Sequence, residues 1–145
     1  MIPHLFSKKS IPRRIPSMKK EILLLKKTKT KRECLKKAYD IITSKYRGGR
    51  VETYLRFHQL FMHDPQKLWK RKGFLHCTQQ NYLLRVLLIK SGKFHDDDIQ
   101  LKLTSIWGSP HQYLRVSLSE RKSLDVDCWS KSFGTPLGKY MHGFN

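Results

Sequence analysis

The chain has 145 residues, enough for one domain with its own hydrophobic core, and its 30 Lys and Arg against 11 Asp and Glu give a net charge of +19. Such a charge attracts polyanions or anionic surfaces whatever the fold, so it indicates a nucleic acid or another polyanion as a partner and carries no information about catalysis. No apolar run approaches the roughly 18 residues of a membrane span, and the longest early run is too short for a signal peptide. We therefore expect a cytoplasmic protein without a membrane span.

The three cysteines, Cys34, Cys77 and Cys128, are odd in number and widely spaced. Because no two of them form a C-x-x-C pair, they argue against a disulfide framework and a zinc ribbon, and they suit a reducing compartment. The histidines and the acidic run at 96–98 also lack the spacing of a known metal site. We expect neither a metal nor another cofactor.

The first elements in chain order are a leader and two helices. Three prolines and four basic residues within residues 1–17 predict a basic, flexible leader that suits an anionic partner, and residues 18–145 then form a single domain. A short helix holds the apolar residues 22–25, with Ser17 as its cap. Apolar residues at helical spacing next predict a core-facing helix from about 30 to 46.

Paired glycines at 48 and 49 end that helix. A third amphipathic helix is predicted from 51 to 63, because its aromatic and aliphatic residues recur at intervals of three and four. It stops before Pro65, where the sequence is typical of a turn. Residues 68–73 are then expected to form a basic loop.

The next helix is the predicted axis of the domain. Residues 82–89 are apolar at seven of eight positions, interrupted only by Arg85, and a helix of that kind must be surrounded by other elements. It ends near Gly92 and begins near Cys77. The unpaired N–H groups at a helix start stabilise a thiolate, which is the attacking species in acyl transfer. Cys77 is therefore a candidate nucleophile, and the alternative is an inert buried thiol.

Three strands are predicted after this helix, at about 99–107, 109–118 and 123–127. A cysteine becomes a catalyst when a histidine takes its proton and a third polar group fixes the histidine's tautomer. His111, near the start of the second strand, is the candidate base. Asp125 and Asp127 lie on the same side of the third strand, so periodicity does not decide which of them is the third group.

The order of these pieces resembles the transglutaminase-like superfamily of papain-type cysteine enzymes. The matching segments are Gly73-Phe-Leu-His-Cys77 before a Leu-rich helix, Pro110-His-Gln-Tyr-Leu-Arg-Val116, and Leu124-Asp-Val-Asp127. By this resemblance, which covers roughly residues 34–135, Cys77 is the nucleophile, His111 the general base and Asp127 the residue that orients the base.

We therefore expect an α+β fold in which N-terminal helices and a buried Cys-bearing central helix pack on a small antiparallel sheet, as in a transglutaminase-like or cysteine-proteinase-like core. The expected reaction is attack of Cys77 on an amide bond of a protein or peptide substrate, followed by hydrolysis or by transfer to an amine. Two alternatives stay open, namely a non-enzymatic basic nucleic-acid-binding protein and a degenerate transglutaminase-like domain that serves as a binding module. The oligomeric state stays open as well.

Overall fold

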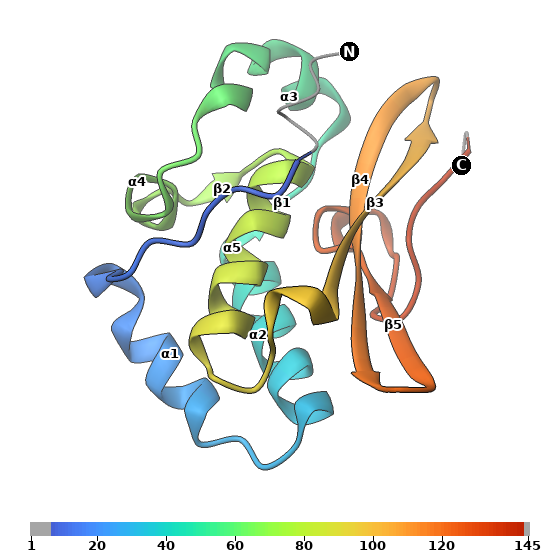
Figure 1. Cartoon of the computed structure of the whole chain (residues 1–145). Coiled ribbons are helices and arrows are strands. Elements are labelled where there is room, and N and C mark those ends of the chain that lie inside the picture. The colour runs from blue at the N-terminus through green and yellow to red at the C-terminus, as the bar shows by residue number, and fades with distance from the viewer. Residues whose placement is uncertain (1–6, 144–145) are drawn as a thin grey trace.

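The structure is a computed structural model and describes residues 7–143; residues 1–6 and 144–145 lie outside the described residues. The helices of this part of the chain are α1 (Lys19–Lys26), α2 (Lys31–Lys45), α3 (Arg50–Leu55), α4 (Pro65–Lys70) and α5 (Cys77–Lys90). The strands are β1 (Tyr46–Arg47), β2 (Gly73–Phe74), β3 (Ile99–Ile106), β4 (Ser109–Ser119) and β5 (Lys122–Val126). The fold is mixed α and β, with the helices on one side and the antiparallel strands on the other (Figure 1).

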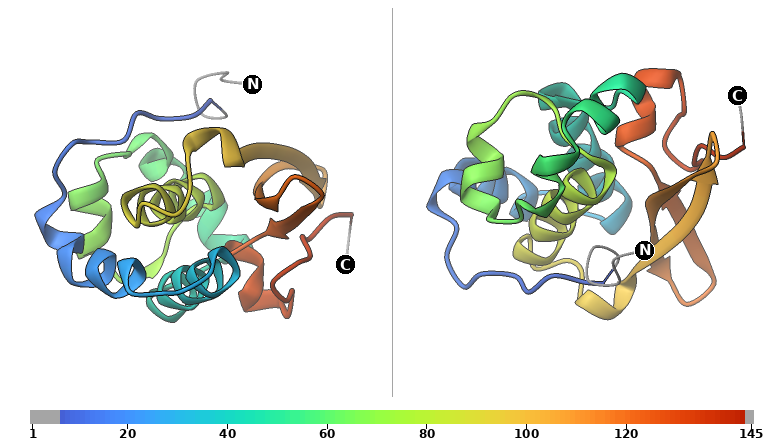
Figure 2. Two further views of the ribbon diagram at one scale, coloured as in Figure 1. Left: turned by 60° about the horizontal axis from the view of Figure 1, so that its bottom comes forward. Right: turned by 90° about the horizontal axis from the view of Figure 1, so that it is seen from above.

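Helix α5 is the centre of the core, as predicted. Ten of its 14 residues are buried, and Figure 2 shows it end-on with the other helices and the sheet around it. Its one charged residue within the apolar run, Arg85, is neutralised because Nη2 lies 3.0 Å from Asp96 Oδ1 and Nη1 donates to the Lys9 carbonyl. The ion pair and the carbonyl contact offset the cost of burying this guanidinium, although its Nε has no hydrogen-bond partner among the described residues.

Helix α2 confirms the prediction of a core-facing helix at 30–46. The Thr30 hydroxyl accepts a hydrogen bond from Glu33 N at 3.1 Å, which caps the helix start. Leu35, Ala38 and Ile42 are all buried against the core. The preceding short helix α1 holds residues 22–25 as predicted, but Ser17 is not its cap, because the helix begins after Met18 and the Ser17 hydroxyl donates to Gln66 Oε1 at 2.9 Å.

The three predicted strands form one antiparallel sheet in the order β3-β4-β5. The side chains of Leu114 and Val116 on β4 are fully buried against the core, together with Ile99 and Val126 of the neighbouring strands. β1 and β2 form a separate parallel pair that aligns Tyr46 with Gly73. This pair brings the end of α2 next to the start of α5.

Two predictions for the middle of the chain were wrong. The expected helix at 51–63 is a short α3 followed by a 3-10 turn, Phe57–Phe61, and neither contains a buried residue. Its apolar periodicity does not mark a core face, since Leu55 is 72% exposed. The first residues of the expected loop at 68–73 belong instead to the end of α4. Asp64 caps this helix by accepting a hydrogen bond from Gln66 N, and Pro65 occupies its first turn.

The described part of the predicted leader, residues 7–17, contacts the domain. Tyr82 Oη donates to the Ser10 carbonyl at 2.8 Å, and Lys90 Nζ donates to the Arg13 carbonyl at 2.9 Å. Ile15 is buried in the core. The remainder of that prediction, residues 1–6, falls outside the described residues. Between residues 7 and 143, no helix is both long and apolar enough to cross a membrane.

If α5 is the axis of the core, shortening a buried leucine on it must be costly. We expect Leu84→Ala to lower the free energy of unfolding by about 2–5 kcal/mol, because the side chain is fully buried and its removal leaves a cavity. The matched control is Leu103→Ala on β3, where the side chain is 49% exposed and the change should cost about 0.5 kcal/mol or less. Urea denaturation measures both, and equal losses in the two variants would contradict the assignment of the core.

Candidate active site

Cys77 is the first residue of α5 and is partly exposed, whereas Cys34 and Cys128 are buried. The start of the helix is held by Gln79, whose Oε1 accepts a hydrogen bond from His76 N at 3.0 Å. Gln79 Nε2 in turn donates to the Gln59 and Met62 carbonyls. Cys77 therefore sits at a rigid helix N-terminus, where N–H groups without an intrahelical partner favour negative charge.

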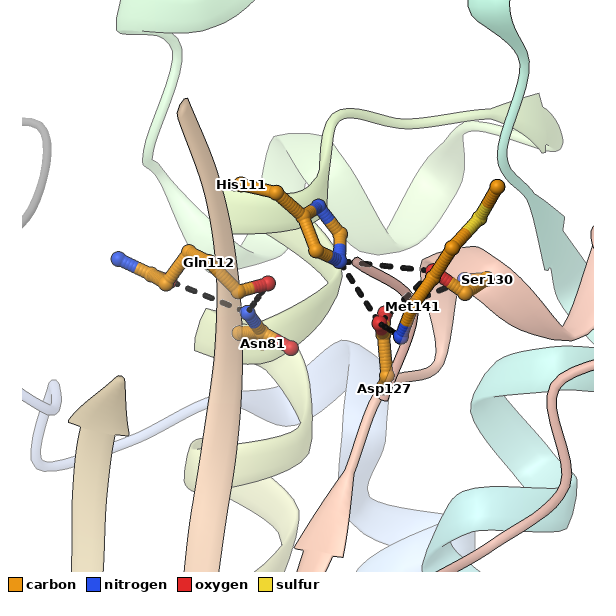
Figure 3. A network of polar contacts seen from close by, with 6 residues as sticks. All are labelled: Asn81, His111, Gln112, Asp127, Ser130 and Met141. Atoms are coloured by element: carbon orange, nitrogen blue, oxygen red, sulfur yellow. Dashed lines mark hydrogen bonds and ion pairs between the residues drawn. The ribbon is translucent and has the colours of Figure 1, made fainter. Parts of the chain in front are cut away.

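The structure brings His111 and Asp127 into direct contact, with 2.7 Å between His111 Nε2 and Asp127 Oδ2 (Figure 3). Both side chains are almost fully buried. The same carboxylate accepts hydrogen bonds from Ser130 Oγ at 2.7 Å, Ser130 N at 3.2 Å and Met141 N at 3.0 Å. The position of Asp127 is thus determined by several donors, and it orients the His111 ring.

His111 and Cys77 line the same cleft, and the groups around the His111 ring change its protonation. Burial alone would lower the pKa of His111, but the hydrogen bond to Asp127 and the nearby Cys77 sulfur outweigh burial and raise the pKa of His111 to about 10. Asp127 binds Nε2, so Nδ1 is the ring nitrogen that makes no bond to the carboxylate. At neutral pH the ring is therefore a cation paired with the Asp127 carboxylate.

The two aspartates of the third strand have different partners. Asp125 Oδ1 accepts a hydrogen bond from Arg115 Nε at 2.8 Å, so its carboxylate is paired on the face of the sheet. Asp127 lies just beyond β5 and is the one that contacts His111. Sequence periodicity left this choice open, and the pairing of β4 with β5 decides it.

A side chain that sequence reasoning did not connect with this site is Trp129. It is 5% exposed, and its ring centroid lies 5.3 Å from that of His111. An aromatic ring in this position shields the His111–Asp127 pair from water and strengthens their interaction. The sequence contained one signal for the local structure around Trp129, namely the spacing Asp127-x-x-Ser130. An aspartate that accepts a hydrogen bond from the N–H three residues later is typical of a helical cap.

Gly48 is a second missed residue, because the sequence suggested only a helix stop. A Cβ built on Gly48 would lie 2.2 Å from the Trp129 carbonyl oxygen and 2.7 Å from its ring. Gly48 N also donates to Ser132 Oγ at 3.0 Å. Glycine is therefore required here by the close approach of the backbone to the Trp129 loop.

Asn81, one turn after Cys77 on α5, connects this helix to the His111 strand. Its Nδ2 donates to the Gln112 carbonyl at 3.0 Å and to Gln112 Oε1 at 3.2 Å (Figure 3). Because Gln112 is next to His111 in β4, this buried contact fixes where the imidazole lies along α5 relative to the cysteine. His76, next to Cys77 in sequence, is directed elsewhere, with Nε2 2.8 Å from the Arg56 carbonyl oxygen.

Cys77 and His111 line a cleft of about 360 Å³, which we call the active-site cleft. One wall comes from α3 and the turn after it, and the other from the β3–β4 hairpin and Trp129. Among residues 7–143, no three His, Cys, Asp or Glu side chains are grouped so as to hold a metal ion. The acidic run at 96–98 is used in ion pairs with Lys8, Lys31 and Arg85.

No protein-family model, curated protein or solved structure matches the chain. The interpretation of the site therefore rests on its own geometry and chemistry.

The role of Asp127 can be tested through the protonation of His111. Asp127→Asn removes the negative acceptor and should lower the pKa of His111 from about 10 toward its ordinary value of 6.5, as measured by NMR titration of the ring. The raised native pKa also stabilises the fold below pH 6.5, and this contribution is lost as the pH rises to about 10. The free energy of unfolding of the wild type relative to Asp127→Asn should decrease over that range.

Asp125→Asn is the matched control for that titration, because Asp125 is two residues from Asp127 but pairs with Arg115 of β4 instead of His111. We expect the pKa of His111 to be almost unchanged in this variant. An equal change in both variants would contradict the assignment of Asp127 as the orienting residue.

The packing of Gly48 on Trp129 can be tested in the same way. Gly48→Ala should lower the free energy of unfolding by about 1–3 kcal/mol, since the added methyl group collides with backbone and ring atoms. Gly49→Ala is the control, because there the methyl group meets mainly the end of the Glu52 side chain, which can move aside at the cost of its partly exposed ion pair with Arg47. Thermal unfolding measures the difference, and the contact would be refuted if Gly49→Ala were the more damaging change.

Proposed function

We propose that the chain is a transglutaminase-like cysteine enzyme that transfers the acyl group of an amide or peptide bond through Cys77, His111 and Asp127. The observation that carries this proposal is that His111 is hydrogen-bonded to the anchored carboxylate of Asp127 and lines an open cleft together with Cys77, whose sulfur contributes to the raised pKa of His111. The nucleophile, its base and the group that orients the base are the three parts that covalent catalysis by cysteine needs.

The mechanism follows from the protonation of the pair. The Cys77 thiolate attacks the carbonyl carbon of the substrate and forms a carbon–sulfur bond, and the Cys77 backbone N–H supplies one donor to the oxyanion. The His111 imidazolium then gives its proton to the departing amine as the carbon–nitrogen bond breaks, which leaves a thioester. A second acceptor loses its proton to the ring and attacks the thioester, which frees the cysteine. Water as the acceptor makes the reaction hydrolysis, and an amine makes it transamidation.

The arrangement of the elements also supports a transglutaminase-like core. The cysteine begins the central helix, the histidine lies near the start of a following strand, and the aspartate follows the next strand. The cleft is open to solvent on one side, since Tyr54 and Phe57 on its wall are more than half exposed. A protein or peptide chain therefore has access to Cys77.

The net charge of +19 favours a second role, the binding of a nucleic acid or another polyanion. This role is compatible with catalysis, since the charge also raises the local concentration of an acidic substrate. A degenerate domain that only binds would keep the charge without a reactive cysteine. The reactivity of Cys77 therefore separates the alternatives.

The test is alkylation by iodoacetamide at mildly acidic pH, followed by peptide mass spectrometry. We expect Cys77 to be labelled selectively, and we expect His111→Ala to slow this labelling by about 100-fold, because the imidazolium that favours the thiolate is lost. Cys34 and Cys128 are internal controls because both are buried, and burial raises the pKa of the Cys128 thiol. Equal labelling of all three cysteines, together with salt-sensitive RNA binding, would favour the non-enzymatic role.

A further inference from the structure

The walls of the active-site cleft are mostly aromatic and aliphatic. Six apolar side chains from both sides line the space above Cys77: Tyr54, Phe57, Leu60, Ile106, Trp107 and Trp129. The volume of about 360 Å³ lies in the range of small-molecule sites and exceeds what a water cluster needs. This cleft can therefore accept a large side chain beside the reacting carbonyl.

Several polar groups that line the cleft already bind protein atoms. Tyr54 Oη and Ser109 Oγ form a hydrogen bond with each other at 2.7 Å, from opposite walls. Thr53 Oγ1 donates to the Gly49 carbonyl at 2.7 Å, and His76 Nε2 is bound to the Arg56 carbonyl. A carboxamide or charged side chain in the cleft would lose its water without gaining these partners, which is unfavourable.

Trp107 has a positive φ, which is an unfavourable backbone conformation for a bulky residue. It is the first residue of the two-residue turn between β3 and β4, where φ is 52° at Trp107 and 78° at Gly108. Such turns favour Asn-Gly, and a bulky residue at positive φ is uncommon. Its ring lies against the Arg50 guanidinium at 4.7 Å and the Phe133 ring at 5.5 Å, and it lines the cleft. Strained residues of this kind are often kept for function.

We propose that the active-site cleft is a subsite for an aromatic or large aliphatic side chain on the acyl group that Cys77 attacks, and that Trp107 determines this specificity. The inference rests on the proposed function and narrows it. It selects amides of apolar acyl groups as substrates, and it disfavours glutamine as the acyl donor because the walls are mostly apolar and the hydroxyls of Thr53, Tyr54 and Ser109 are bonded to protein atoms.

The experiment compares chloromethyl ketones of N-acetylphenylalanine, N-acetylglycine and N-acetylglutamine. Each forms a carbon–sulfur bond with Cys77 and releases chloride, so the rate constant of alkylation is read by mass spectrometry. We expect the phenylalanine compound to react at least about tenfold faster than either of the others, as expected for burial of its ring. Trp107→Asn, which suits the turn, should reduce the phenylalanine-to-glycine ratio by about threefold or more.

Leu103→Asn is the matched control, because it removes an exposed apolar side chain from the same hairpin outside the cleft. The ratio should stay as in the wild type. A phenylalanine compound that is no faster than the glycine or glutamine compound would overturn the subsite. So would a ratio that Trp107→Asn leaves unchanged.

A separate binding measurement tests the subsite even if the proposed enzymatic function fails. If iodoacetamide labelling of Cys77 does not depend on His111, the enzyme proposal fails, and the subsite is then tested in Cys77→Ser by NMR. N-Acetylphenylalaninamide should shift the indole N–H signals of Trp107 and Trp129, whereas N-acetylglycinamide should not. Equal shifts with both amides, or none with either, would overturn the subsite.

Discussion

The hydrogen bond between His111 and Asp127 is the contact on which the rest of the site depends. A buried charged pair costs desolvation, and it persists only when further hydrogen bonds satisfy its atoms. Here Ser130 and the backbone N–H of Met141 provide those bonds, so the carboxylate joins β4, the segment after β5 and the C-terminal tail. Removing one partner of such a pair typically costs about 3–5 kcal/mol, because the other charge stays buried. The contact that orients the imidazole therefore also holds together three segments of the fold.

Three buried amide side chains position Cys77 relative to that pair. They lie two, three and four residues after the cysteine, and each connects α5 to a different neighbour. Gln79 binds the turn after α3, Gln80 Nε2 donates to the Arg47 and Leu75 carbonyls, and Asn81 binds Gln112 on β4. The first turn of α5 thus makes directional hydrogen bonds through polar side chains, whereas its second half is apolar and makes packing contacts that have no preferred direction. This division lets one helix serve both as the axis of the core and as the support of the candidate nucleophile Cys77.

The wall of the cleft formed by α3 and the following turn has few buried contacts. Its large apolar side chains face the cleft or solvent, and Val51 and Leu55 are 63% and 72% exposed. A segment held in this way contributes little to stability and is suited to contact a ligand. The proposed apolar specificity gives Tyr54, Phe57 and Leu60, which line the cleft, a role that packing does not. The high positive charge is a separate property, which acts on the approach of partners rather than on the chemistry at Cys77.

The local patterns of the sequence were sufficient for the main elements. Apolar residues at 82–89 predicted a buried central helix, alternation predicted the strands from 99 to 127, and the position of Cys77 at the helix start followed from both. Periodicity failed between residues 51 and 63, because it records that one side of a segment is apolar and does not record whether that side meets the core or a cleft. The Asp-Pro start of α4 was a local signal that was interpreted as a turn.

What only the tertiary structure decided is which side chains meet. Asp125 and Asp127 have the same periodicity, and the strand register gives one to Arg115 and the other to His111. The fit of Gly48 against Trp129 joins residues about 80 positions apart, and it depends on the β1–β2 pair and the 3-10 segment Trp129–Phe133. The physical reason is that hydrophobic periodicity is a property of neighbours along the chain, whereas hydrogen bonds between distant segments depend on the packing that brings them together.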